Sequence, residues 1–347
     1  MSQVDWFLGL LDRRPRIKDR ISKGRGPATH VIILDGTMSS LAPGEETNAG
    51  LTYKLLREVG NGINLTVYYE AGVQWRDWSS TLDVMMGRGV NRQIIRAYGV
   101  LAGRYRPGDR IILIGYSRGA FAVRSLAGVI DMVGLVRARD ATVRTIRQAW
   151  RHYRLGARSA MLPEFRAAYC HPEVVIEAAG VWDTVKALGL RLPVLWRWAE
   201  AAQSFHNHAL GPHVRHGFHA LALQERREAY APVLWMTEPG DDRVEQVWFR
   251  GTHGDIGGQL GDYVAARPLA NIPLCWMLSR LQGVGLPLPD GWRTRFACDA
   301  EAPSVGSWRG WGKLFLSRRR RMVGRDPSEA LHASVRRGIR GLRPALP

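Results

Sequence analysis

The chain has 347 residues, of which 46% are hydrophobic and 23% are charged. These are ordinary values for a globular protein, and the length allows one large α/β domain or two smaller ones. The formal net charge of +18 indicates attraction to a polyanion (nucleic acid, an anionic membrane surface or a phosphate-bearing substrate) or else a solvated basic surface. Three widely spaced cysteines without a C-x-x-C pair argue against a disulfide framework or a zinc finger and favour a reducing compartment; they are Cys170, Cys275 and Cys298.

A short N-terminal segment, residues 1–28, precedes the first predicted strand. Its apolar patch over residues 6–11 is too short for the core of a signal peptide, and the basic residues follow the patch instead of preceding it. No run in the chain approaches the ~18 apolar residues of a membrane span. We therefore expect a chain made in the cytoplasm, with the patch packed on the domain as a helix. Seating of the patch at a membrane interface is the alternative.

Five apolar or β-branched runs follow along the chain, and each predicts a strand. They cover residues 30–36, 64–70, 110–115, 174–183 and 244–251. Apolar residues recur at helical spacing between them, for example over 91–105 and 269–281. This alternation predicts an α/β fold, with a mainly parallel sheet covered by helices on both faces. Ligands of such sheets bind beyond the carboxyl ends of the strands.

Two stretches interrupt the alternation, and the chain ends in a basic segment. Residues 136–170, rich in arginine, and residues 190–230, with Trp196, Trp198 and several histidines, are predicted helical insertions. They divide a catalytic domain that covers residues 29–300. The strongly basic segment 301–347, with SRRRRM at 317–322, is expected to pack on the same domain, as a helix end or as an arm that faces a polyanion.

The third predicted strand leads directly into the sequence GYSRG at residues 115–119. Apolar residues at helical spacing follow it. A serine between two glycines, at a turn from a buried strand to a helix, is typical of a nucleophile elbow. Glycine is favoured there because strand and helix approach each other too closely for a β-carbon. We therefore predict that Ser117 is a nucleophile.

A serine hydroxyl is a weak nucleophile, so it needs a general base and a group that orients the base. In sheets with a nucleophile elbow, the chain order is serine, then an acid, then histidine. Asp183 lies at the end of the fourth predicted strand, and His253 lies in a glycine-rich loop after the fifth. This order predicts a triad of Ser117, Asp183 and His253. Asp255, two residues from His253, is expected to order the loop and not to orient the imidazole.

Several blocks of the sequence together resemble one family. The blocks read ILDGT, YYEAGV, GYSRGAFAVRSLAGVI, AGVWDTVKALG, FHALALQERR, VEQVWFRGTHGDIGG and LHASVRR. They are similar to successive signatures of an α/β-hydrolase domain, long described as a domain of unknown function, that is shared with type VI secretion phospholipase effectors. The similarity runs from about residue 29 to about residue 337. Met38 stands where members usually carry a tryptophan.

The resemblance implies a serine esterase or lipase of phospholipase type. It places the nucleophile on Ser117, the acid on Asp183 and the base on His253, and it requires no metal or organic cofactor. Fold logic adds an oxyanion hole, with the backbone N–H of Arg118 and a second donor near Gly36 and Thr37. The implied partners are a lipid or small ester substrate and an anionic membrane surface. A secretion or immunity partner, with export by type VI secretion, is implied if the chain is an effector.

Two other hypotheses stay open on the sequence. In the first, Asp35, Asp183, His253 and Asp255 converge at strand ends and hold a divalent cation for metal-dependent hydrolysis; otherwise Asp35 and Asp255 support the site. In the second, the protein is a non-enzymatic binder of a polyanion. Nucleic acid is the weaker partner there, because no stacking-aromatic or helix-turn-helix signature accompanies the arginines.

Overall fold

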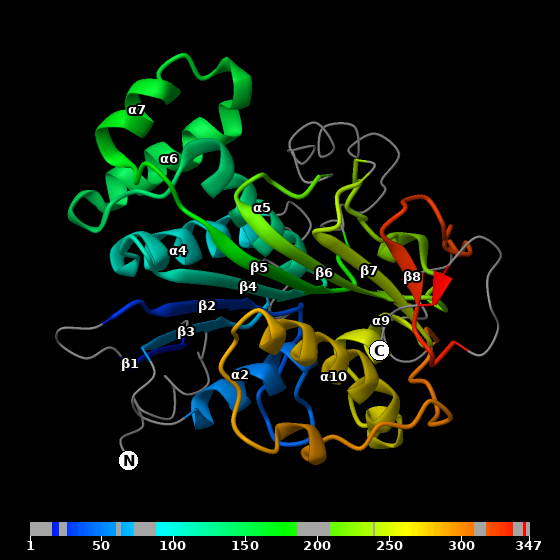
Figure 1. The fold of residues 1–347 in the computed structure, drawn as a ribbon. Coiled ribbons are helices and arrows are strands. Elements are labelled where there is room, and N and C mark those ends of the chain that lie inside the picture. The colour runs from blue at the N-terminus through cyan, green and yellow to red at the C-terminus, as the bar shows by residue number, and fades with distance from the viewer. Residues whose placement is uncertain are drawn as a thin grey trace, which may run out of the picture.

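One twisted sheet forms the centre of the molecule (Figure 1). The computed structural model describes residues 16–20, 26–59, 64–72, 88–185, 209–238, 240–308, 317–335 and 343–344. Within these residues the sheet has nine strands in the order β1-β3-β2-β4-β5-β6-β7-β8-β9. Only β1 is antiparallel to its neighbour. The strands are β1 (Arg16–Arg20), β2 (Thr29–Leu34), β3 (Leu65–Glu70), β4 (Arg110–Tyr116), β5 (Ile176–Trp182), β6 (Val214–Ala222), β7 (Val244–Phe249), β8 (Glu329–Leu331) and β9 (Arg343–Pro344).

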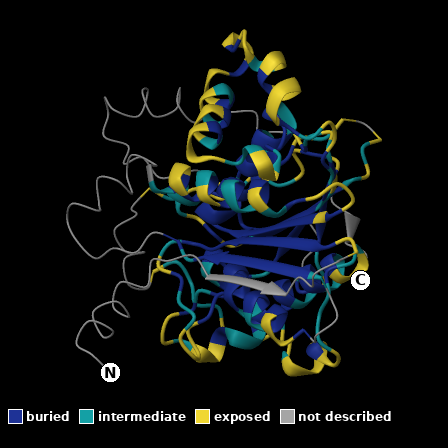
Figure 2. Cartoon of the chain, turned by 90° about the vertical axis from the view of Figure 1, so that its left-hand side faces the viewer, coloured by how far each residue is buried: buried dark blue, intermediate teal, exposed yellow. Residues whose placement is uncertain are grey.

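Helices cover both faces of the sheet (Figure 1). Helices α4, α5, α6 and α7 lie on one side, and α2, α9 and α10 lie on the other. Figure 2 shows the strands buried between the two helical layers. The helices are α2 (Asn48–Glu58), α4 (Arg88–Arg104), α5 (Arg118–Val133), α6 (Val143–Leu155), α7 (Leu162–Tyr169), α9 (His253–Gly257) and α10 (Arg267–Gly283).

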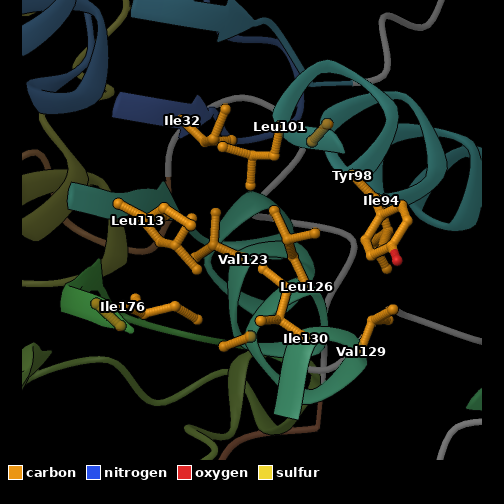
Figure 3. Close-up of a cluster of buried hydrophobic side chains, with 14 of the residues drawn as sticks. Ile32, Ile94, Tyr98, Leu101, Leu113, Val123, Leu126, Val129, Ile130 and Ile176 are labelled. Atoms are coloured by element: carbon orange, nitrogen blue, oxygen red, sulfur yellow. The ribbon is translucent and has the colours of Figure 1, made fainter. Parts of the chain in front are cut away.

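Alternation along the buried strands divides the core into two layers, because successive side chains of a strand point to opposite faces. On β2, Ile32 faces the helices α4 and α5, whereas Ile33 faces α2 and α10. Figure 3 shows the first layer, in which Ile32 and Leu113 of the sheet meet Val123 of α5. The sheet is therefore apolar on both faces, as expected for parallel strands.

The α/β-hydrolase-like fold expected from the sequence is confirmed, with a mainly parallel sheet between helical layers. All five predicted strands are present, with ends that differ by a few residues. One expectation is wrong. Residues 214–222 were placed in a helical insertion, but they form β6, which lies between β5 and β7. Its sequence, VRHGFHALA, was not recognised as a strand because Arg215, the half-buried His216 and the buried His219 interrupt the apolar pattern.

The segments outside the predicted domain also join the sheet. The N-terminal segment contributes β1 and the basic C-terminal segment contributes β8 and β9. Within residues 136–170 the structure has α6 and α7. The apolar patch at 6–11 and the tryptophans at 196 and 198 lie outside the described residues. None of the described helices combines the length and the apolar character needed to cross a bilayer.

Candidate active site

A strained turn presents Ser117 between β4 and α5. Its backbone has φ 57° and ψ −120°, a conformation that a non-glycine residue rarely adopts. The glycines on either side of the turn are required because a β-carbon would not fit there. A β-carbon at Gly119 would lie 2.0 Å from the carbonyl oxygen of Leu34, and one at Gly115 would lie 2.7 Å from the backbone of Ala120. The GYSRG sequence therefore forms the sharp turn from strand to helix that its glycines predict.

His253 begins the short helix α9, directly beyond the end of β7. Thr252 caps this helix, and its backbone N–H donates to the Asp255 carboxylate over 2.7 Å in a capping box. The imidazole lies between the rings of Tyr116 and Tyr230, with ring centroids 4.9 and 4.8 Å away. Its Nε2 lies 2.8 Å from the Ser117 hydroxyl oxygen. Packing thus fixes the ring with one nitrogen directed at the serine.

Asp183 follows β5 and takes the other nitrogen of the imidazole. The distance from its Oδ2 to His253 Nδ1 is 2.5 Å, and its Oδ1 accepts a hydrogen bond of 3.0 Å from the Ala222 backbone N–H. Asp183 is fully buried and has a positive φ of 40°. The three side chains predicted from the sequence thus lie in one hydrogen-bonded row, from Asp183 through His253 to Ser117.

A fourth side chain, which was not predicted from the sequence, is in contact with this row. Arg321 donates from both terminal nitrogens to Asp183, over 2.6 Å to Oδ1 and 2.9 Å to Oδ2. The basic run at 317–322 was expected to face a polyanion or to end a helix. Arg321 instead points inward, with a side chain only 4% exposed. The guanidinium of Arg318 stacks over Trp308 at 3.4 Å. No pattern in a run of arginines indicates which one is buried.

The charge on Asp183 depends on these neighbours. Burial alone would raise the pKa of the carboxyl group, since it disfavours the charged form. The Arg321 guanidinium and hydrogen bonds from His253 and Arg321 outweigh burial, so that the pKa of Asp183 lies well below its ordinary value. These neighbours therefore favour the ionised form of the carboxylate next to the imidazole.

The loop after β2 offers one of the two oxyanion donors expected from it. The N–H of Gly36 donates to Asp35 Oδ1 over 2.7 Å, so Gly36 is not available, which corrects that expectation. Among the described residues, the backbone N–H groups of Thr37 and Arg118 have no acceptor. The Arg118 side chain donates to the Thr37 hydroxyl and ties this loop to the start of α5. Next to Thr37, Met38 has a positive φ of 61°.

The two supporting aspartates are held away from the row. Asp35 accepts hydrogen bonds from the hydroxyl groups of Thr47 and Tyr69, over 2.6 and 2.7 Å. Asp255 accepts from Thr252 and, on its other oxygen, from the N–H of Val305 over 2.8 Å. Within the described residues, no three His, Cys, Asp or Glu side chains lie together as metal ligands. The convergence of four side chains that the metal hypothesis requires is therefore absent from this part of the chain.

Comparisons with known proteins show the family of the chain, and the similar proteins are longer than the part that matches. Residues 29–280 match the family described as type VI secretion system phospholipase effector, Tle1-like, catalytic domain. An uncharacterized protein of Saccharomyces cerevisiae is 27% identical over 235 residues, which are 60% of this chain and 33% of that protein. The chain therefore spans about a third of the length of this curated relative.

Two solved structures are also similar. An uncharacterized protein from Pseudomonas aeruginosa is 16% identical with a TM-score of 0.44, over 80% of this chain and 52% of the other. The Tle1 effector bound to the VgrG spike of the type VI secretion system is 17% identical with a TM-score of 0.39, over 70% of this chain and 53% of the other. The chain spans about half of each of these proteins.

Proposed function

The chain belongs to the family of Tle1-like phospholipase effector catalytic domains of the type VI secretion system, and from that premise we propose that it hydrolyses carboxylic esters of lipids with Ser117 as nucleophile. One observation carries the proposal: the hydrogen-bonded row in which His253 lies 2.8 Å from Ser117 and 2.5 Å from Asp183. A serine at a strained elbow, an imidazole within reach and an ionised carboxylate behind it are the parts that acyl transfer needs.

In the first half of the reaction, the Ser117 oxygen attacks the ester carbonyl while His253 Nε2 takes the hydroxyl proton. Asp183 accepts the Nδ1–H bond, selects this tautomer and stabilises the imidazolium that forms. The imidazolium then gives its proton to the leaving alcohol, and an acyl group stays on Ser117. In the second half, His253 deprotonates a water that attacks this acyl ester, and the imidazolium returns the proton to the leaving Ser117 oxygen, so the acid is released and the serine is restored.

Backbone N–H groups would stabilise the charge that develops on the carbonyl oxygen. The candidates are the N–H groups of Arg118 and Thr37, one at the start of α5 and the other in the loop after β2. Such donors are typically worth ~3–4 kcal/mol each, because they are fixed before the charge appears. The bond from the Arg118 side chain to the Thr37 hydroxyl would hold the two donors in register.

The test compares hydrolysis of p-nitrophenyl esters and phospholipids by the unchanged protein and by Ser117→Ala. We expect activity on both substrate classes in the unchanged protein and its loss in the variant. The fold should survive, because the Ser117 side chain contributes little packing. Full activity of Ser117→Ala would remove this serine from the mechanism. EDTA-sensitive activity that persists in the variant would favour the metal hypothesis instead.

We propose that an arginine face on α6 makes the expected contact with an anionic lipid surface. Arg144, Arg147, Arg151 and Arg154 are exposed at spacings of three and four residues, which places them on one side of the helix. None of them forms an ion pair within the described residues. Val143, at the start of the helix, is 68% exposed. Basic residues near an anionic membrane contribute ~1 kcal/mol each, and α6 lies on the outer side of α4 and α5 (Figure 1).

The test measures binding of the inactive Ser117→Ala protein to phosphatidylglycerol vesicles. Changing the four arginines of the α6 face to Gln should weaken binding by at least about tenfold. A matched variant that changes Arg106, Arg319, Arg320 and Arg325, all exposed, removes the same charge and should bind nearly as well. Equal losses in both variants would mean that net charge acts without a docking face. Type VI export and an immunity partner stay predictions.

A further inference from the structure

Arg321 and Asp183 form an ion pair with two separate points of contact. Each terminal nitrogen of the guanidinium faces its own carboxylate oxygen, over 2.6 and 2.9 Å. This two-point arrangement suits arginine, whose planar fork matches a carboxylate. Both side chains are buried, Asp183 at 0% and Arg321 at 4% exposure. A buried pair of this kind fixes the orientation of the carboxylate and not only its charge.

The guanidinium is itself held in place by backbone groups around the site. One terminal nitrogen also donates to the carbonyl of Ala222 over 2.8 Å, and the other donates to the carbonyl of Tyr230 over 2.6 Å. Ala222 also bonds Asp183 through its N–H. Tyr230 packs edge-on against the imidazole of His253. Arg321 therefore links the acid to the end of β6 at Ala222 and to Tyr230, whose ring contacts the base.

The segment that carries Arg321 is anchored on both sides. Before it, the N–H of Arg319 donates to the carbonyl of Arg226 over 2.7 Å. After it, Glu329 accepts from the N–H of Gly324 over 2.9 Å and from the indole of Trp248 over 2.7 Å. This segment lies beyond residues 29–280, which match the family. The chain thus brings a cation to the acid from outside the matched domain.

Other ionisable groups face this region, and none replaces the charge of Arg321. Burial raises the pKa of Tyr116 and of Tyr230 and lowers the pKa of His219 to about 3, so these three are neutral near pH 7. Glu225 and Arg227 pair with each other over 2.7 Å. Among the described residues, Arg321 is thus the cation in direct contact with Asp183.

We propose that Arg321 is a positioning residue for the hydrolysis: it keeps Asp183 ionised and oriented toward His253 Nδ1 down to acidic pH. The proposal rests on the proposed function, because it assigns Arg321 a role through the acid of that row. Without the guanidinium, burial would favour the protonated carboxyl group. Removal of the guanidinium should therefore extend protonation of Asp183 to higher pH.

The experiment records kcat and KM against pH on a short-chain p-nitrophenyl ester for Arg321→Gln, Arg321→Lys and Arg320→Gln. Arg320 is the exposed neighbour in the same run and serves as control. Arg321→Gln should lower kcat by about ten- to a hundredfold with little change in KM. The acidic limb of its profile should move to higher pH by about one unit. Arg321→Lys should recover part of both effects, and Arg320→Gln should match the unchanged protein.

A double variant separates positioning from a direct or merely structural role. If Arg321 acts through the acid, adding Arg321→Gln to a protein that already carries Asp183→Asn should lower kcat further by at most about threefold. Two outcomes would overturn the proposal: independent, multiplicative losses in the double variant, or an Arg321→Gln protein with an unmoved acidic limb. If Arg321→Gln does not fold, Arg321→Lys and the double variant decide by the same criteria. Failure of the proposed function is distinct, because the unchanged protein would then hydrolyse no ester.

Discussion

Two buried aspartates, at the ends of the strands on either side of β4, have opposite surroundings. Asp183 follows β5 and faces the Arg321 guanidinium and an imidazole. Asp35 follows β2 and faces the neutral hydroxyl groups of Thr47 and Tyr69 and the N–H of Gly36. Burial raises the pKa of Asp35 to about 6 despite these hydrogen bonds, whereas the pKa of Asp183 lies well below its ordinary value.

Burial at a strand end therefore does not by itself make an aspartate the acid of a triad. Neutral donors can hold a buried carboxyl group in place, yet they leave its ionisation costly. A cation within hydrogen-bonding distance reverses the balance. In the proposed reaction Asp183 would therefore act as a fixed negative charge, whereas Asp35 holds the loop that carries Thr37 through its bond to the N–H of Gly36.

The largest effect should come from Asp183→Asn. The amide keeps the size of the side chain but cannot fix the same tautomer of His253, and kcat should fall by ~10³–10⁴-fold, as in other triads. The measurement is ester turnover at saturating substrate, with circular dichroism as a check of folding. Asp35→Asn is the matched change at the end of β2 and should lower kcat by no more than about tenfold. A reversed ranking of the two variants would mean that the acid is wrongly assigned.

Stability against pH should separate the same two residues. The pKa of Asp35 is raised from 3.8 to about 6 in the folded state. The contribution of Asp35 to the free energy of unfolding is therefore complete below its unfolded-state pKa and is lost as pH rises through about 6. The stability of the unchanged protein relative to Asp35→Asn should therefore fall by about 2 kcal/mol between about pH 4 and about pH 7.5. Denaturant unfolding of both proteins at the two pH values measures this change.

Asp183 should show the opposite dependence of stability on pH. Its folded-state pKa is depressed, so its contribution is present above its unfolded value and is lost as pH falls through the folded value. Relative to Asp183→Asn, the unchanged protein should therefore become less stable on acidification. The same trend for both aspartates would contradict the opposed surroundings described above.

The smallest effect on turnover is expected for Asp255→Asn. This carboxylate caps α9 and accepts from Val305 but makes no contact with the imidazole ring in the described structure. We expect a loss of about 1–3 kcal/mol in the free energy of unfolding and less than about tenfold in kcat. Thermal unfolding and ester turnover would be measured on one preparation. A loss of turnover as large as that of Asp183→Asn would show that the loop, and not the strand end, supplies the acid.

Local patterns carried the prediction of the fold and of the row of three side chains. The apolar runs gave β2, β3, β4, β5 and β7 because buried parallel strands need apolar residues on both faces. Ser117 could be selected because its two glycines have a steric purpose that a short sequence displays. Asp183 and His253 followed from chain order, since parallel strands end at one edge of the sheet.

Features that depend on distant parts of the chain were not predicted. Arg321 lies 138 positions from Asp183, and its three neighbouring arginines look identical in sequence. Gly36 appeared suitable as an oxyanion donor, but its N–H is taken by Asp35, a contact that only the folded loop reveals. Strand β6 was missed because its polar residues include His219, which is buried within the sheet and hydrogen-bonded to Gln246, so that packing overrides the polar pattern.

Mapping the site of covalent modification by a fluorophosphonate probe shows directly whether Ser117 is the nucleophile. The probe reacts with a serine that a neighbouring base activates, so the account predicts one adduct, located by peptide mass spectrometry on Ser117. Labelling should be much slower in Asp183→Asn and absent in Ser117→Ala. An adduct on another residue, or no adduct in a protein that hydrolyses esters, would contradict the assignment of Ser117 as nucleophile.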